Sequence, residues 1–219
     1  MKIFLDTANL EGIKKWAPTG LIDGVTTNPT HLSKEGPNPK DLILAICALL
    51  PEGEISVEVT QDSPDAIYKQ AREIAALAPN ILVKVPCHHQ YYQVIKRLAD
   101  EEIPLNITLV FTVIQGLMMC KLGVQYISPF VGRLDDIDVD GISVLPELQE
   151  MVDEYGFDTG ILAASLRGVR QLHDAILCGV DAATIPLPVF EKMIENPLTD
   201  QGMRMFNADW AKLSIKQFP

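Results

Sequence analysis

Short apolar stretches recur along the chain, and most are separated by segments with a helical pattern. In residues 80–87, NILVKVPC, apolar and β-branched residues surround Lys84, as in a strand that is buried on both faces. Alternating strands and helices of this kind predict an α/β protein with a (β/α)8 TIM barrel; a doubly wound open sheet is the alternative. The eight predicted strands are 2–6, 24–28, 55–60, 81–85, 105–111, 124–130, 160–165 and 181–187.

Several helices have recognisable ends or faces. Ser63 followed by Pro64 is a typical N-cap and first helical residue. The helix after the seventh strand is expected to end at Gly179. Its buried face is expected to contain Leu166, Val169, Leu172, Ile176 and Leu177.

A last amphipathic pattern follows the eighth strand, in TDQGMRMFNADWAKL. A barrel does not need this helix for closure, so two interpretations are open: it packs on its own barrel, or on a neighbouring subunit. We expect a single domain over residues 1–219, with this additional helix at about 199–213. Its apolar residues are spaced by three and four: Met203, Phe206, Trp210 and Leu213.

Composition and charge narrow the classes of function. A net charge of −11 argues against binding to nucleic acid or to anionic membranes, so an anionic substrate requires a local basic pocket. The cysteines show no CxxC spacing and are interpreted as free thiols. The first residues, MKIFLDT, have the pattern of a strand rather than of a signal peptide, and we expect a cytoplasmic protein.

Polar side chains are concentrated at the carboxyl ends of the predicted strands, where TIM barrels carry their chemistry. One buried polar residue is often structural, but polar groups on so many strands favour a common site. All but one of the residues at these ends are polar: Asp6, Asn28, Glu58, Lys84, Asn106, Thr108, Phe130 and Ser165.

A lysine in an apolar strand suggests covalent catalysis, although a structural Lys84–Glu58 ion pair is an alternative. Desolvation favours the neutral amine, which attacks ketones and forms a Schiff base. The protonated imine is an electron sink for cleavage of a carbon–carbon bond. Asp6 and Glu58 can divide the acid and base steps, and Asn28 and Asn106 can bind sugar hydroxyls.

A phosphate site is also predicted. Arg133 follows the sixth strand, and Ser165 and Arg167 are expected to open the helix after the seventh, where backbone N–H groups and guanidinium groups suit a phosphate dianion. No metal is expected, because His88 and His89 are adjacent and point in different directions, without an evident third ligand.

The motifs FLDTAN, GVTTNP, VEV, VKVP, NITLVF, SPFVGR and AASLR occur in the order typical of transaldolases. Nearly the whole chain resembles the short, single-domain subfamily that also contains fructose-6-phosphate aldolases. The resemblance implies a Schiff-base barrel without metal or organic cofactor. Transaldolases move a dihydroxyacetone unit from fructose 6-phosphate or sedoheptulose 7-phosphate to erythrose 4-phosphate or glyceraldehyde 3-phosphate, in the pentose phosphate pathway.

The resemblance also implies roles for single residues. Lys84 resembles the Schiff-base lysine, and Asp6 resembles the base that deprotonates the C4 hydroxyl. Glu58 and Thr108 resemble the pair that handles the catalytic water. The remaining matches are substrate contacts: Asn28 and Asn106 for the hydroxyls, and Arg133, Ser165 and Arg167 for the phosphate.

Two positions separate the sister activities. The aldolases carry glutamine and tyrosine where this chain has Glu58 and Phe130, so the sequence follows the transaldolase pattern. An aldolase that releases free dihydroxyacetone is the alternative, and a non-catalytic sugar-phosphate-binding barrel is a second one. The loop at Cys87, His88 and His89 departs from the family pattern. Short members commonly form pentamers or decamers in which the last helix crosses to a neighbour, so a homo-oligomer is expected.

Overall fold

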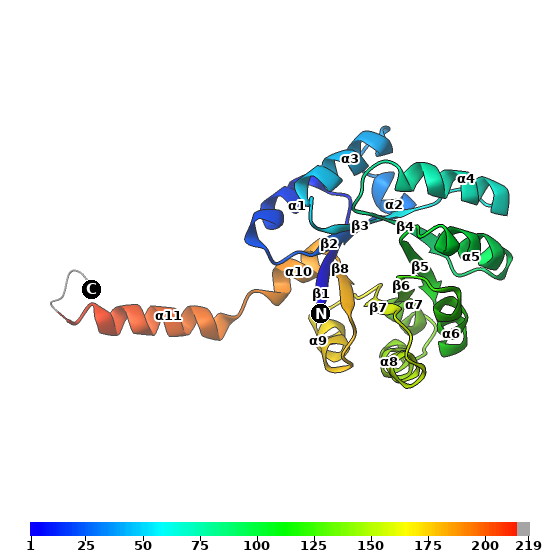
Figure 1. Cartoon of the computed structure of the whole chain (residues 1–219). Helices are drawn as coiled ribbons and strands as arrows, with labels where there is room; N and C mark the ends of the chain where they lie inside the picture. Colours follow the sequence, from blue (N-terminus) through cyan, green and yellow to red (C-terminus); the bar gives the residue numbers. More distant parts are fainter. Residues whose placement is uncertain (214–219) are drawn as a thin grey trace.

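The computed structural model describes residues 1–213 and contains a closed barrel of eight parallel strands (Figure 1). Each strand pairs with its neighbours in chain order, and the first pairs with the eighth. The predicted (β/α)8 barrel is therefore confirmed. The strands are β1 (Lys2–Asp6), β2 (Gly24–Thr26), β3 (Glu54–Glu58), β4 (Ile81–Pro86), β5 (Leu105–Val110), β6 (Tyr126–Pro129), β7 (Gly160–Ala163) and β8 (Ala182–Ile185).

Helices surround the barrel and cover the outward side chains of the strands, such as Val25, Ile55 and Val83, which are fully or almost fully buried. The helices are α1 (Leu10–Trp16), α2 (Pro29–Leu32), α3 (Pro39–Leu49), α4 (Pro64–Ala75), α5 (Tyr92–Asp100), α6 (Val113–Leu122), α7 (Val131–Asp135), α8 (Val144–Tyr155), α9 (Val169–Leu177), α10 (Leu187–Met193) and α11 (Pro197–Trp210).

The inward side chains form an apolar layer with polar groups at both ends. Phe4, Leu82 and Leu162 belong to a separate buried cluster inside the barrel. Below this layer, at the amino ends of the strands, Lys2 Nζ lies 2.9 Å from a Glu54 carboxylate oxygen. The Tyr126 hydroxyl is 3.1 Å from each of these two side chains. This end of the barrel is closed by paired groups, so the carboxyl ends of the strands are left for a binding site.

The sequence signals for α4 are confirmed, whereas those for α9 are partly wrong. Ser63 caps α4 by accepting from the backbone N–H of Ala66. Gly179 has φ of +77° after α9, as expected for a helix stop. However, Leu177 is 73% exposed, and Ile176 is also exposed.

The error in α9 has a geometric reason. Leu166 lies before the helix, and the buried face is defined by Leu172 and Ala175. At about 100° per residue, Leu177 points almost opposite to that face and Ile176 lies at its flank.

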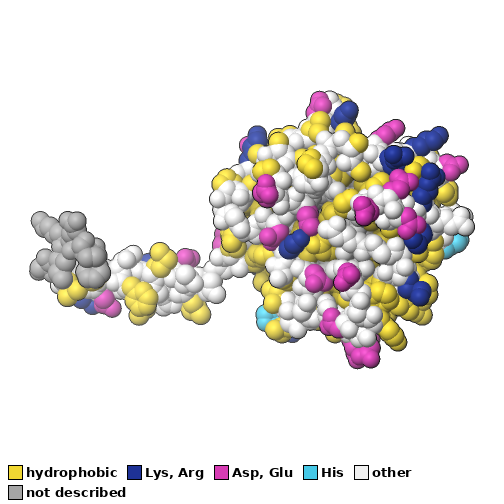
Figure 2. All heavy atoms as spheres, in the orientation of Figure 1, with side chains coloured by type: hydrophobic (Ala, Val, Ile, Leu, Met, Phe, Trp, Pro, Cys, Tyr) yellow, Lys and Arg dark blue, Asp and Glu magenta, His cyan; other side chains and the backbone are white. Residues whose placement is uncertain are grey.

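The last helix, α11, extends away from the barrel (Figures 1 and 2). Its apolar side chains are exposed, with Phe206 at 74% and Met203 at 58%, and Leu213, three residues after the helix, is 50% exposed. The interpretation in which this helix packs on its own barrel is therefore wrong. Within residues 1–213, no helix is both long and apolar enough to cross a membrane.

Candidate active site

Lys84 lies inside the barrel near the carboxyl end of β4 and is only 5% exposed. Its Nζ is 3.1 Å from Glu58 Oε2 and donates a hydrogen bond to the Thr27 carbonyl oxygen at 3.2 Å. Parallel pairing of β3 with β4 sets Glu58 directly beside Lys84. The amine is thus removed from bulk water and held beside one carboxylate at the mouth of the barrel.

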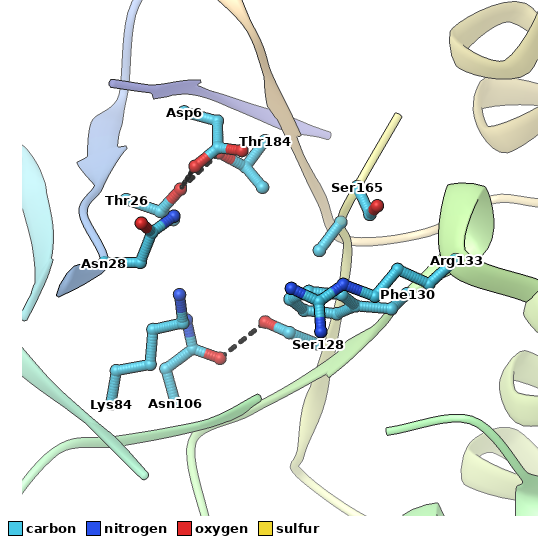
Figure 3. Close-up of a pocket in the computed structure, with 11 residues that line it drawn as sticks. Asp6, Thr26, Asn28, Lys84, Asn106, Ser128, Phe130, Arg133, Ser165 and Thr184 are labelled. Atoms are coloured by element: carbon cyan, nitrogen blue, oxygen red, sulfur yellow. Dashed lines mark hydrogen bonds between the residues drawn. The ribbon is translucent and has the colours of Figure 1, made fainter. Parts of the chain in front are cut away.

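A cavity opens above Lys84 at the carboxyl ends of the strands (Figure 3). Lys84 and Asp6 enter it from opposite sides, and Arg133 and Phe130 form a third wall. Residues on strands far apart in the sequence thus meet at one site. The cavity is lined by Asp6, Thr26, Asn28, Lys84, Asn106, Ser128, Phe130, Arg133, Ala164, Ser165 and Thr184.

An adjoining hollow beside Lys84 contains Glu58 and Thr108, the pair predicted to handle the catalytic water. Thr108 Oγ1 is buried and has no hydrogen-bond partner within the described part of the chain. A buried hydroxyl without a partner is costly, so it indicates a place for a water molecule or a substrate hydroxyl.

The backbone at Thr108 is irregular. The pairing of β5 with β6 shifts register between Ile107 and Val110, and Leu109 has φ of +60°. Such bulges at barrel rims redirect side chains, and a non-glycine residue at positive φ stores strain. The bulge places Thr108 and Leu109 together in the lining of the hollow.

The two asparagines are held by hydrogen bonds that leave part of each amide available. Asn28 caps α2, and its Oδ1 accepts from the backbone N–H of His31 at 2.9 Å. Asn106 donates to Ser56 Oγ at 3.0 Å and accepts from Ser128 Oγ at 2.6 Å. An amide nitrogen carries two donors, so each asparagine keeps donor capacity for a hydroxyl.

The Asp6 carboxylate is surrounded by residues that were not predicted. Thr26 Oγ1 donates to Asp6 Oδ1 at 3.1 Å, and the Thr26 and Thr184 hydroxyls are 2.6 Å apart. His31 Nε2 lies 3.3 Å from the same Oδ1 atom. Strand alternation provides a signal for Thr26, two residues before Asn28, and for Ser128, two before Phe130. No such signal exists for His31.

The predicted phosphate site is only partly assembled. Arg133 and Ser165 line the cavity, and the Arg133 guanidinium lies 5.2 Å from the centre of the Phe130 ring. Arg167 does not line the cavity, because both of its terminal nitrogens donate to Asp136. This guanidinium holds the pKa of the Asp136 carboxyl below its usual range.

The local backbone around the phosphate site also differs from the expectation. The helix after β7 begins at Val169, with Gly168 as its N-cap, so Ser165 and Arg167 lie in the preceding loop. Ser165 has φ of +60° and its carbonyl accepts from the Gly132 N–H at 3.1 Å. A side chain at Gly132 would collide with that carbonyl oxygen, so glycine permits the close approach of the two loops.

The unusual loop after β4 lies beside the site. His88 and His89 are exposed, with ring centres 4.5 Å apart. Burial raises the pKa of the Cys87 thiol to about 11. A thiol in this state is a poor nucleophile at neutral pH.

Comparisons with known proteins identify the family. Residues 3–217 match the model of the transaldolase/fructose-6-phosphate aldolase family. The chain is 46% identical to a probable transaldolase of Dehalococcoides mccartyi, over 96% of this chain and 98% of that protein. It is also 46% identical to a probable transaldolase of Lactiplantibacillus plantarum, over 99% of this chain and 100% of that protein.

Solved structures add the fold alone. A thiamine phosphate pyrophosphorylase of Pyrococcus furiosus superposes with a TM-score of 0.61 at 15% identity, over 88% of this chain and 93% of that chain. The sequence motifs, the closed barrel and the buried lysine beside a carboxylate agree with the family match. The chain belongs to the transaldolase/fructose-6-phosphate aldolase family.

Proposed function

We propose that this enzyme is a transaldolase that moves a dihydroxyacetone unit between sugar phosphates through a Schiff base on Lys84. The observation that carries the proposal is the position of Lys84, buried beside Glu58 at the floor of a polar cavity. The donors are fructose 6-phosphate or sedoheptulose 7-phosphate, and the acceptors are erythrose 4-phosphate or glyceraldehyde 3-phosphate. The reaction requires no metal or organic cofactor.

The proposed reaction begins when Lys84 Nζ, after it has transferred a proton to Glu58, attacks the C2 carbonyl of the ketose phosphate. The carbinolamine loses water, and the C2–nitrogen double bond forms as a protonated imine. Asp6, across the cavity, removes the C4 hydroxyl proton (Figure 3). The C3–C4 bond breaks, an aldose phosphate leaves, and the bond electrons move to the imine, which becomes an enamine. The enamine then attacks the carbonyl carbon of the acceptor aldehyde and forms a new C3–C4 bond. Hydrolysis of the imine releases the new ketose phosphate and frees Lys84.

Glu58 and Thr108 are suited to the dehydration step. Glu58 Oε2 is 3.1 Å from Lys84 Nζ. At this distance the carboxylate can reach a water that leaves C2 of the carbinolamine, the carbon bonded to Nζ. Thr108 contributes to the same hollow a buried hydroxyl that has no hydrogen-bond partner within residues 1–213. The two groups are therefore placed to carry protons to and from that water.

The phosphate group is proposed to bind between Arg133, Ser165 and Arg167. Arg133 and Ser165 already line the cavity. Arg167 is held by Asp136 on the exposed rim and must release this carboxylate to reach the phosphate. Exchange of one anionic partner for another keeps the guanidinium paired, but the competition reduces its net contribution.

Arg133→Ala is therefore expected to raise KM for fructose 6-phosphate more than Arg167→Ala does. A charge-assisted contact is worth about 1.5–3 kcal/mol, or roughly ten- to a hundredfold, and the Arg167 contribution is lower by the competition with Asp136. Steady-state kinetics with fructose 6-phosphate and with unphosphorylated fructose measure the effect. Equal losses on both sugars would show that the arginines do not bind the phosphate.

The choice between transfer and release is proposed to depend on Phe130. Its ring packs against Phe111, with centres 6.1 Å apart, and lines both the cavity and the hollow beside Glu58. An apolar ring at this place offers no hydroxyl to orient a water for hydrolysis of the intermediate. The intermediate then persists until an aldehyde acceptor arrives.

Phe130→Tyr should increase the release of free dihydroxyacetone and decrease transfer. The added hydroxyl can orient a water and donate a proton, and Glu58→Gln in addition is expected to increase release further. A coupled assay with fructose 6-phosphate, with and without erythrose 4-phosphate, measures both rates. If the wild type releases free dihydroxyacetone without an acceptor as fast as it transfers the unit to erythrose 4-phosphate, the enzyme is an aldolase. If it forms neither free dihydroxyacetone nor the transfer product, the barrel only binds sugar phosphates.

We also propose that α11 binds a neighbouring copy of the chain in a homo-oligomer, such as a pentamer or decamer. Support comes from its exposed apolar side chains and its extension away from the barrel (Figure 2). A charge at Phe206, as in Phe206→Asp, is expected to reduce the assembled mass in light scattering. The matched control is Asn207→Asp, which adds a charge at the adjacent helical position. A full-length wild type that is monomeric contradicts the proposal.

A further inference from the structure

The proposed base, Asp6, is contacted through one oxygen only. Thr26 Oγ1 donates to Oδ1 at 3.1 Å, and His31 Nε2 lies 3.3 Å from the same atom. Within residues 1–213, no hydrogen bond is made to Oδ2. Thr26 lies at the end of β2, and His31 lies in α2, the short helix that follows it. Figure 3 shows Thr26 and Thr184 beside Asp6.

The direction of the hydrogen bonds behind Asp6 follows from their chemistry. An ionised carboxylate only accepts, so the single hydroxyl proton of Thr26 points at Asp6 Oδ1. Thr26 therefore accepts from Thr184 across the 2.6 Å contact, and the order of donation is Thr184 to Thr26 to Asp6. Both hydroxyls belong to buried residues, where a polarised chain of this kind is strengthened.

His31 also contacts Asp6. Its Nε2 lies 3.3 Å from Oδ1 and can donate to this oxygen when it carries the ring proton. The backbone N–H of His31 donates to the Asn28 side chain at 2.9 Å. This hydrogen bond fixes the start of α2 and the backbone position from which the imidazole extends. His31 thus approaches Oδ1 from the rim, whereas Thr26 approaches it from inside the barrel.

We propose that Thr184, acting through Thr26, and His31 are positioning residues that hold Asp6 by Oδ1, so that Oδ2 is the atom that accepts the proton of the substrate hydroxyl. The proposal rests on the proposed function, in which Asp6 is the base for bond cleavage. The two side chains that contact Oδ1 limit the rotation of the carboxylate. The other oxygen is left to meet the substrate, within a small range of angles.

Imine formation and bond cleavage can be measured separately, which makes the proposal testable. Dihydroxyacetone has no C4 hydroxyl, so borohydride trapping of its imine on Lys84 requires no base at Asp6. Transfer from fructose 6-phosphate to erythrose 4-phosphate requires both steps. Loss of a positioning residue is expected to lower kcat for transfer, with KM and the trapping yield almost unchanged.

The first test compares Thr184→Val with Thr184→Ser. Thr184→Val keeps the shape but removes the hydroxyl, and kcat should fall roughly two- to tenfold; Thr184→Ser should restore it. The matched control is Thr159→Val, which removes an equally buried hydroxyl that donates to the Val124 carbonyl oxygen at 2.8 Å, at the amino end of β7. If Thr159→Val lowers kcat as much as Thr184→Val, the effect is structural and the proposal fails.

The second test uses His31. His31→Leu should lower kcat roughly tenfold, and His31→Gln, which keeps a nitrogen donor at similar reach, should recover part of it. A change in KM alone, a fall in the trapping yield, or equal rates for the two variants would overturn the role of His31. If the wild type itself gives no trapped adduct and no transfer, the proposed function fails instead.

Discussion

Replacement of Lys84 by arginine is expected to abolish transfer while the protein remains folded. Arginine keeps the positive charge that pairs with Glu58 3.1 Å away, so the carboxylate is not left unpaired. A guanidinium group stays protonated in proteins and cannot attack a carbonyl. The larger head is expected to cost some stability, because Lys84 is only 5% exposed.

The measurement combines a transfer assay with borohydride reduction in the presence of fructose 6-phosphate. Wild type should carry one dihydroxyacetone adduct per chain, on the peptide that contains VKVP, and Lys84→Arg should carry none. Lys121→Arg, on the outer helix α6, is the matched control and should keep both activity and adduct. An adduct on another lysine, or transfer by Lys84→Arg, would contradict the mechanism.

Asp6→Asn is expected to stop bond cleavage but not imine formation. The amide can still occupy the place between Thr26 and His31, with little change in volume, but it cannot accept the C4 hydroxyl proton. Loss of a general base typically costs about 10²–10⁴ in rate, so transfer should fall by that factor. Trapping with dihydroxyacetone should continue at nearly the wild-type yield.

Separate measurements of imine trapping and of transfer distinguish the role of Asp6 from that of Glu58. Glu58→Ala is expected to slow trapping as well as transfer, because Glu58 lies beside Lys84 and is proposed to act on the water that leaves during imine formation. If Asp6→Asn also loses trapping, Asp6 acts before bond cleavage, and the proposed division of roles between the two carboxylates is wrong. Mass spectrometry of the reduced protein reports the yield directly.

Much of this arrangement could be predicted because strand alternation is a local property. Once β4 is recognised, Lys84 must point into the barrel, and the same rule applies to Asn106 and Thr108 on β5. Arg167 differs, since its direction is set by Asp136, which lies 31 residues earlier in a loop with no periodic pattern. Side chains whose partners lie on distant loops have no signal in one sequence.

The helices show the same division between local and distant determinants. Apolar spacing predicts that the region around Met203 and Phe206 is helical, and α11 confirms it. The spacing does not specify which surface this face meets, and in the structure it meets none of the barrel helices (Figure 1). His31 lies in α2, a helix of four residues that is too short for a pattern of burial to mark it as a neighbour of Asp6.

Pairing of the first strand with the last has a consequence for folding. The Thr26 and Thr184 hydroxyls are 158 residues apart in the sequence, so the surroundings of Asp6 are complete only when β8 closes the barrel onto β1. The strands that pair with the Lys84 strand, β3 and β5, precede β8 in the chain. Contacts of such long sequence separation form slowly. During refolding, recovery of activity should therefore lag behind recovery of helical structure and should mark the closure of the barrel.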